Sequence, residues 1–368
     1  MSRRSDSADY AQLFLSGTPL LDTRAPVEFA KGSFPTAVNL PFMTDDERAA
    51  VGTCYKQKGQ DAAIALGHEL VSGSVKEERV ETWAEFARQN PTGYLYCFRG
   101  GMRSQISQQW LKEAGVDYPR VTGGYKAMRR FLIDNLDRLC TTAQFWLVAG
   151  ATGCGKTRLV TALPRSVDLE GLAKHRGSAF GRLLEPQPSQ IDFENAISIE
   201  LLKLGQSAGP VLLEDEGRLI GRLSLPENLR ERMAQAPLLV LRYPLEDRVQ
   251  VVLEDYIIDL GRRFFESHGE DGMEQHRTRL LGDLERTRKR LGGERYAEVS
   301  QMMTIAFDDQ IKSGNIEAHR AWIETLLRDY YDPMYEYQLS QREGRSLAEG
   351  TREELAAYVA EMLGDAEQ

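Results

Sequence analysis

The chain has 368 residues, of which 42% are apolar and 27% charged, and its formal net charge is −9. This composition is ordinary for a globular protein, the length predicts two domains, and the acidic balance argues weakly against a nucleic-acid partner. No apolar run approaches about 18 residues and the polar N-terminus lacks a signal-peptide core, so we expect a cytoplasmic protein without membrane association.

The first part of the chain alternates short apolar runs with helical segments. Such alternation is typical of an α/β domain, which we expect to end near residue 140. Strand-like runs are predicted at 20–21, 37–40, 94–96 and 121–125, and helical segments at 45–90, 105–114 and 127–139.

A cysteine-headed loop, CFRGGMRS, occupies residues 97–104 after the third of these strands. Its glycine pair lets backbone N–H groups turn inward as a nest, and the following helix start adds partial positive charge. Both effects, together with the charges of Arg99 and Arg103, stabilise a thiolate over a thiol. We therefore predict a catalytic nucleophile, Cys97, in an anion-binding cradle. The four cysteines contain no Cys-x-x-Cys pair, so neither a metal site nor a disulfide framework is expected.

A complete phosphate-binding loop, GATGCGKT, follows a predicted strand at 145–149. In such a loop backbone amides surround a phosphate chain, the lysine contacts the outer phosphates and the threonine reaches Mg²⁺ where one is bound. The residues predicted to bind the phosphate compound are Gly150, Gly153, Gly155, Lys156 and Thr157.

Further strands are predicted at 166–169, 211–215 and 238–241, separated by helical segments, and this order predicts a parallel sheet. Glu214-Asp215-Glu216 ends a buried strand, where we expect Asp215 to organise Mg²⁺. From about residue 245 the chain is expected to be entirely helical, and 347–363 to form one amphipathic helix.

Several motifs of the N-terminal part resemble a rhodanese domain, a fold in which the loop cysteine carries sulfur as a persulfide. They are Asp22-Thr23-Arg24, Glu28-Phe29, Gly32, the 35–41 stretch PTAVNLP and the Cys97 loop. The loop spacing here, Cys97-x5-Arg103, is one residue wider than in small rhodaneses and equals that of cysteine phosphatases. A wider loop suits a larger atom or a tetrahedral oxyanion.

A rhodanese domain followed by a P-loop domain resembles the tRNA 2-selenouridine synthase family. The stretches VGTCYKQKGQDAAIALGHELV (51–71) and DLEGLAKHRGSAFG (168–181) extend the resemblance over nearly the whole chain. It implies an α/β protein with a rhodanese-like domain at 1–140 and a P-loop NTPase-like parallel-sheet domain, with a helical C-terminal region, at 141–368.

The resemblance also implies an activity, in which selenium from selenophosphate replaces sulfur in 2-thiouridine at the tRNA wobble position. Geranyl diphosphate would first geranylate that sulfur, which makes it a better leaving group. Cys97 would then hold selenium as a selenylated cysteine, with Arg99 and Arg103 stabilising the anion. The P-loop would bind a diphosphate, with Mg²⁺ as a candidate ion and no covalently bound cofactor. The stretch His175-Arg176-Gly177-Ser178 would add charge near the P-loop or the tRNA backbone.

Three other functions remain open on sequence alone. The Cys97-x5-Arg103 spacing also fits a cysteine phosphatase, although Tyr96 replaces the histidine that usually precedes that cysteine. The P-loop fits a small-molecule kinase or ATPase with a regulatory rhodanese module. A non-enzymatic tRNA-binding protein would tolerate loss of Cys97.

Overall fold

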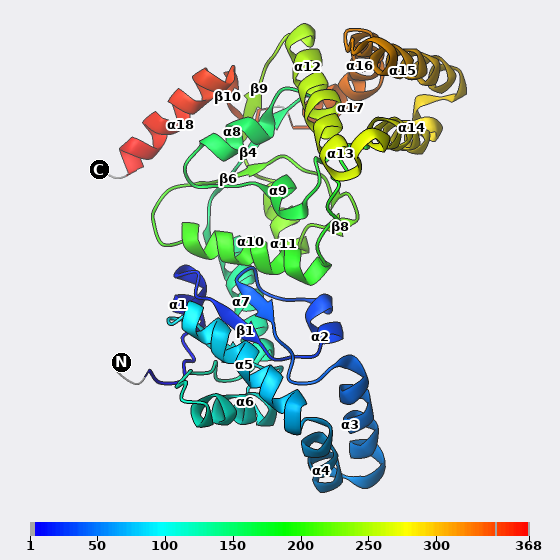
Figure 1. The fold of residues 1–368 in the computed structure, drawn as a ribbon. Coiled ribbons are helices and arrows are strands. Elements are labelled where there is room, and N and C mark those ends of the chain that lie inside the picture. The colour runs from blue at the N-terminus through cyan, green and yellow to red at the C-terminus, as the bar shows by residue number, and fades with distance from the viewer. Residues whose placement is uncertain (1–3, 343, 367–368) are drawn as a thin grey trace. The chain divides into compact units, whose positions relative to one another are not determined.

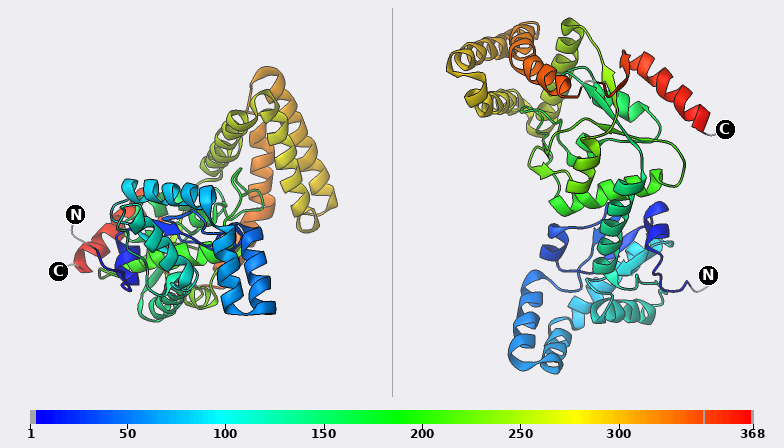
Figure 2. Two further views of the ribbon diagram at one scale, coloured as in Figure 1. Left: turned by 60° about the horizontal axis from the view of Figure 1, so that its bottom comes forward. Right: turned by 180° about the vertical axis from the view of Figure 1, so that it is seen from behind.

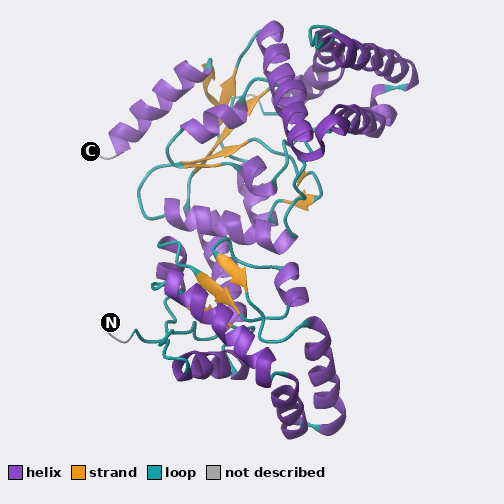
Figure 3. Ribbon diagram, in the orientation of Figure 1, coloured by secondary structure: helices purple, strands orange, loops and turns teal. Residues whose placement is uncertain are grey.

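The protein is described here by a computed structural model that covers residues 4–342 and 344–366. Its internal contacts divide the chain into two compact units, each with its own parallel sheet (Figures 1 and 3). Unit 1 consists of Met1–Leu139 and Ser189–Lys203, and unit 2 of Cys140–Pro188 and Leu204–Gln368.

Unit 1 is built on a three-stranded parallel sheet in the order β2-β1-β3. The strands are β1 (Leu20–Asp22), β2 (Ala37–Asn39) and β3 (Tyr94–Tyr96), and Leu21 of β1 lies opposite both Val38 and Leu95. The predicted strands at 20–21, 37–40 and 94–96 are thus confirmed, whereas the run at 121–125 forms only isolated bridges. Helices flank this sheet: α1 (Tyr10–Leu15), α2 (Pro26–Lys31), α5 (Gly73–Gln89), α6 (Met102–Glu113) and α7 (Gly124–Thr142).

Two further helices of unit 1, α3 (Asp45–Lys58) and α4 (Gln60–Leu70), form a hairpin. α3 begins at a capping box, in which the Thr44 hydroxyl accepts from the Glu47 N–H and the Glu47 carboxylate accepts from the Thr44 N–H. The hairpin appears in blue in Figures 1 and 2.

A buried network fixes the end of β3, from which the cysteine loop departs. The Arg24 guanidinium pairs with Asp22 at 2.6 Å, and the Tyr96 hydroxyl donates to the same carboxylate at 2.7 Å. The guanidinium also lies 3.7 Å from the centre of the Tyr125 ring. The Asp22–Arg24 ion pair is fully buried, so neighbouring side chains have to satisfy both charges. The contacts with Tyr96 and Tyr125 therefore connect β1 and β3 to the start of α7.

Helix α10 (Gln190–Leu204) packs with unit 1, although the sequence placed it in the second domain. Its Ile199 and Leu202 join the core formed by residues such as Phe14 and Leu132. Asn135 of α7 donates to the carbonyl of Ser198 at 3.1 Å. Contacts between residues more than 60 positions apart, which no local pattern reveals, decide where this helix packs.

Unit 2 is built on a five-stranded parallel sheet in the order β10-β9-β4-β6-β5, which confirms the predicted parallel sheet. Helix α8 (Lys156–Ala162) and the C-terminal helix α18 (Arg352–Ala366) pack on it, with Leu159, Val160 and Leu355 in one core. The strands are β4 (Phe145–Gly150), β5 (Ser166–Val167), β6 (Val211–Glu214), β9 (Leu238–Leu241) and β10 (Ser346–Gly350); β7 (Leu219–Ile220) and β8 (Leu223–Ser224) form a separate hairpin.

The expectation of helix throughout the C-terminal region is wrong at β10. This strand pairs in parallel with β9, and α18 begins only at Arg352, so 347–363 is not one helix. The open edge of β9 supplies the hydrogen bonds that extend residues 346–350.

The remaining C-terminal elements are helical, as predicted, and they form their own core around Leu284, Met303 and Trp322. Two of them are π-helical, a rare geometry that often marks functional sites. Among the helices of the described residues, none is long and apolar enough to cross a membrane. The elements of unit 2 not yet given are α9 (Leu169–Ala173), α11 (Glu227–Met233), α12 (Leu245–Val252), η1 (Leu253–Asp259), α13 (Leu260–His268), η2 (Gly269–Asp271), α14 (Gly272–Leu291), α15 (Gly293–Ser313), α16 (His319–Leu326), η3 (Leu327–Tyr331) and α17 (Asp332–Ser340), of which η1 and η3 are π-helical.

Candidate functional site

Cys97 directly follows β3 and opens the loop that ends at α6. Its side chain is only 3% exposed, and its Sγ lies 3.2 Å from the Ser104 hydroxyl, which donates to the Gly101 carbonyl at 2.9 Å. Gly100 has a φ of 63°, and a Cβ there would lie 2.7 Å from the backbone nitrogen of Gly123. Only glycine fits this position, so the loop holds the thiol against the first turn of α6.

The two arginines of this loop have different surroundings. Arg99 is exposed. Arg103 forms a two-pronged ion pair with Glu28, with oxygen–nitrogen distances of 2.6 and 3.2 Å. Burial opposes ionisation of Glu28, but the hydrogen bond and charge of Arg103 outweigh it, so the pKa of that carboxyl lies below its usual value. An anion at the loop therefore competes with Glu28 for Arg103, whose anion-binding role stays a prediction.

The phosphate-binding loop connects β4 to α8 as its motif predicts. Gly153 and Gly155 have φ values of 83° and 79°, and a Cβ on Gly153 would lie 2.8 Å from the Arg248 carbonyl oxygen. The Lys156 ammonium donates to the carbonyl of Gly150 at 3.0 Å across the loop. The Lys156 ammonium therefore lies across the loop whose backbone amides would surround a phosphate group.

Three glutamates gather beside Lys156: Glu214 and Glu216 belong to the acidic cluster that the sequence indicated, whereas sequence reasoning missed Glu170. The Thr157 hydroxyl donates to Glu170 at 3.1 Å, and the Glu170 N–H donates to the buried Glu214 carboxylate at 2.9 Å. Burial and mutual repulsion raise the pKa of the carboxyls of Glu170, Glu214 and Glu216. Burial alone would lower the pKa of Lys156, but the surrounding negative groups raise it, so the ammonium stays charged at neutral pH.

The carboxylate of Asp215, expected to organise Mg²⁺, accepts instead from Arg342 at 2.6 Å. The carboxyls of Glu214 and Glu216 both raise the pKa of Lys156. Asp215 lies between these two glutamates in sequence. Asp215 still lines the cavity over the phosphate-binding loop, so its role as the Mg²⁺-organising carboxylate stays a prediction.

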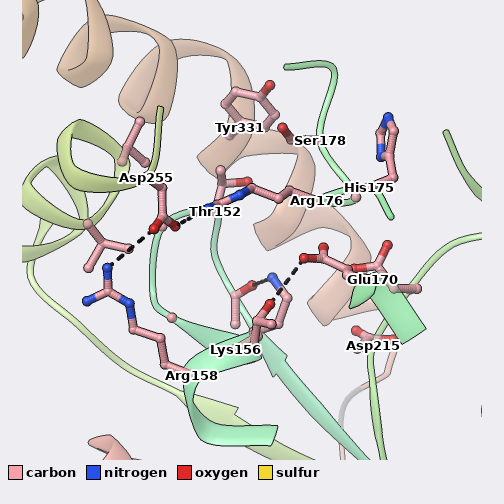
Figure 4. Close-up of a pocket in the computed structure, with 18 of the residues that line it drawn as sticks. Thr152, Lys156, Arg158, Glu170, His175, Arg176, Ser178, Asp215, Asp255 and Tyr331 are labelled. Atoms are coloured by element: carbon pink, nitrogen blue, oxygen red, sulfur yellow. Dashed lines mark hydrogen bonds and ion pairs between the residues drawn. The ribbon is translucent and has the colours of Figure 1, made fainter. Parts of the chain in front are cut away.

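A cavity of about 550 Å³ lies over the phosphate-binding loop (Figure 4). Arg158 and Arg176 both contact Asp255 there, at 3.4 and 2.5 Å, and both remain on the cavity wall. With Lys156 they give the cavity three positive groups suited to a phosphate chain. All the residues predicted to bind the phosphate compound also line this cavity: Gly150, Gly153, Gly155, Lys156, Thr157 and Asp215.

His175 lines the same cavity, and Arg176 beside it provides a positive charge from the stretch 175–178. Burial, followed by the charge of Arg286, lowers the pKa of the His175 imidazole, so the ring is neutral at neutral pH. Arg286 itself belongs to a basic run, 286–290, but it pairs with the buried Asp283 at 2.6 Å. Arg286 of this basic run is therefore held in an ion pair with Asp283.

A small apolar pocket of about 20 Å³ adjoins this cavity and shares wall residues with it, including Val252, Tyr256 and Tyr331. Tyr256 belongs to η1 and Tyr331 to η3, so both π-helical segments contribute to the shared wall. The Tyr331 hydroxyl is buried without a hydrogen-bond partner. The other residues around the apolar pocket include Phe180, Trp322, Ile323, Leu326 and Leu327.

The donors beside Lys156 fit a hard cation that is shared with a phosphate ligand. Mg²⁺ prefers oxygen ligands and usually combines one or two carboxylates with substrate phosphates. The Thr157 hydroxyl and the Glu170 carboxylate supply such oxygens, and Glu214 Oε1 is buried without a hydrogen-bond partner. Within residues 4–342 and 344–366, no group of three or more His, Cys, Asp or Glu side chains is arranged to hold a metal by itself.

Both parts of the chain are similar to known families and proteins. Residues 143–365 match the profile of the tRNA 2-selenouridine synthase AAA domain, and residues 7–130 match that of the rhodanese-like domain. A protein of Marinobacter nauticus named tRNA 2-selenouridine synthase is 54% identical over 361 residues, which covers 98% of each chain. Proteins of the same name from Pseudomonas fluorescens and Hahella chejuensis are 55% and 56% identical, covering 96% of this chain and 97% and 94% of their own.

Proposed function

Because the chain belongs to the tRNA 2-selenouridine synthase family, we propose that it exchanges sulfur for selenium in wobble 2-thiouridine through an S-geranylated intermediate. Selenophosphate is the selenium donor and geranyl diphosphate the geranyl donor in this proposal. The reaction takes place in the cytoplasm, where cysteines stay reduced.

The observation that favours geranyl diphosphate in unit 2 is a charged cavity of about 550 Å³ that adjoins an apolar pocket. The pocket measures about 20 Å³, which is room for about one water-sized group, so most of a hydrocarbon chain would lie in the cavity. Lys156 lies on one side of the shared wall, and Phe180, Trp322 and Leu326 line the pocket on the other. A diphosphate that carries a hydrocarbon chain has the same division into a charged head and an apolar tail.

The first step would be transfer of the geranyl group in unit 2. The thiouridine sulfur forms a bond to C1 of the geranyl chain, the bond from C1 to the diphosphate oxygen breaks, and the base releases its N3 proton. Lys156, Arg158 and Arg176 neutralise the charge that develops on the departing diphosphate. A bound Mg²⁺, held by Thr157 and Glu170, would supply further positive charge to the phosphates.

The second step would be displacement of the activated sulfur at the Cys97 loop. Selenium bonds to C2 of the base, the C2–S bond breaks, and the geranylthiolate leaves and takes up a proton. Selenophosphate already holds selenium at the oxidation level of selenide, so hydrolysis of its P–Se bond to phosphate balances the step without an oxidant or reductant. In this balanced step selenium passes directly to C2 beside Cys97; carrying selenium on the Cys97 sulfur would need a two-electron oxidant in addition, and the role of Cys97 as a selenium carrier stays a prediction.

The test is mass analysis of wobble nucleosides in tRNA from cells that lack this chain and from cells that regain it. We expect 2-selenouridine only where the chain is present, and S-geranyl-2-thiouridine to accumulate when selenium is withdrawn. Restoration of 2-selenouridine with no geranylated nucleoside under selenium depletion would refute the intermediate. No 2-selenouridine in either strain would refute the overall reaction.

A further inference from the structure

Unit 1 contains a second large cavity, of about 500 Å³, which lies between the α3–α4 hairpin and the first turns of α6. This volume is within the usual range for a small-molecule site. Its walls are mainly apolar and include Phe42, Met43, Val51, Ile64, Met102 and Ile106.

The hairpin contributes an apolar face to this cavity, and part of it, including Val51 and Leu70, also packs against the core of unit 1. All of α3 is described by the structure, and none of its residues is buried, while α4 buries only Ala63 and Gly67. Tyr55 and Met102, both on the cavity wall, are 57% and 43% exposed. Protein interiors are normally close-packed, so a hollow of this size lined by apolar groups fits a ligand better than a core.

The cavity adjoins the cysteine loop through a single helical turn. Met102, Arg103 and Ile106 of α6 line the cavity, while Ser104 of the same turn lies 3.2 Å from the Sγ of Cys97. Neighbouring residues of this turn therefore contact the cavity on one side and the thiol on the other. A molecule that reacts beside Cys97 can place an apolar substituent in the cavity.

Charges near the cavity favour a ligand that belongs to a polyanion. Arg48 and Arg103 line it, and both act electrostatically on Glu28, which is the only acid among the described residues of its wall. Two cations against one carboxylate leave this group of side chains with a net positive charge. Such a charge attracts the phosphate backbone beside a modified nucleoside more than it attracts an uncharged lipid.

We propose that this cavity holds the prenyl chain of S-geranyl-2-thiouridine while selenium displaces the sulfur at C2. The inference rests on the proposed function, since it concerns the second step of that reaction. As the C2–Se bond forms and the C2–S bond breaks, the chain leaves as geranylthiol with a proton from solvent. The cavity would select the geranylated base over an unmodified thiouridine, because the latter has no group to fill it.

The experiment uses the full-length protein, selenophosphate and tRNA that carries either S-geranyl- or S-methyl-2-thiouridine at the wobble position. The initial rate of 2-selenouridine formation gives kcat and KM for each substrate. The wild type should prefer the geranyl substrate by at least about 100-fold in kcat/KM, since even one methylene in an apolar pocket is worth about tenfold or more.

Ile64→Trp places a large ring in the cavity and should reduce this preference by at least about tenfold, mainly through KM for the geranyl substrate. Ile311→Trp is the matched control, because Ile311 is also helical but is 50% exposed in unit 2, and its preference should equal that of the wild type. Ile64→Ala is a second variant, which enlarges the cavity and should improve use of an S-farnesyl substrate relative to the wild type.

Two results would overturn the inference, and they are distinguishable. If Ile64→Trp and Ile64→Ala both retain the wild-type preference among prenyl chains, the cavity does not hold the chain although the proposed function stands. If the wild type converts no S-geranyl substrate at all, the proposed function fails together with this inference.

Discussion

Replacement of Lys156 by alanine should separate the two steps of the proposed reaction. The Lys156 ammonium lies across the phosphate-binding loop and stays charged because Glu170, Glu214 and Glu216 surround it. Its attraction to a phosphate oxygen at about 3 Å amounts to about 5 kcal/mol at an effective dielectric constant of about 20. Measured losses of a single transition-state donor are about 3–4 kcal/mol, so geranyl transfer should fall about 10²- to 10³-fold.

The assay compares Lys156→Ala with the wild type on tRNA carrying plain 2-thiouridine and on tRNA already carrying S-geranyl-2-thiouridine. We expect Lys156→Ala to lose selenation of the plain substrate, because the activated intermediate is not made, and to retain most selenation of the geranylated one. Lys312→Ala removes an equivalent ammonium from an exposed position of α15 and should behave as the wild type on both.

One result would refute this reasoning. If Lys156→Ala blocks selenation equally on plain and geranylated tRNA, then the phosphate-binding loop does not serve geranyl transfer alone. Binding of a nucleotide or of selenophosphate at Lys156 would then explain the data better.

Three further predictions concern the thiol loop and the helical core. Cys97→Ser should abolish 2-selenouridine on both substrates while S-geranyl-2-thiouridine still forms, and substantial selenation by the variant would exclude a nucleophilic role for the thiol. Arg103→Lys keeps the charge but loses the two-pronged geometry, so kcat/KM for selenophosphate should fall at least about tenfold with thermal stability retained; unchanged rates at low selenophosphate would contradict this. Burial lowers the pKa of His276 to about 4, so its contribution to folding is present above about pH 6.5 and is lost as pH falls toward 4. That shift corresponds to about 3 kcal/mol, and His276→Gln should flatten the dependence of Tm on pH over this interval; an equally steep profile would count against it.

The sequence alone determined the features that depend on contiguous residues. The run GATGCGKT fixes a strand, a glycine loop and a helix start, and the structure places them at β4, the loop and α8. The run CFRGGMRS does the same after β3. In both cases glycines at positive φ and an apolar strand act within a few residues of each other, so a local pattern is sufficient. The same motifs carried the resemblance to the family, which the comparisons confirm.

Only the tertiary structure decided which side chains these loops meet. Arg103 pairs with Glu28, 75 positions away in sequence, and β10 completes the sheet beside β9 although its sequence had been expected to be helical. The carboxylates beside Lys156 come partly from Glu170 of α9, which has no signature of its own, while Asp215 turns to Arg342, 127 positions distant. Such contacts depend on how separate elements pack against one another, and the residues adjacent in the chain do not determine that packing.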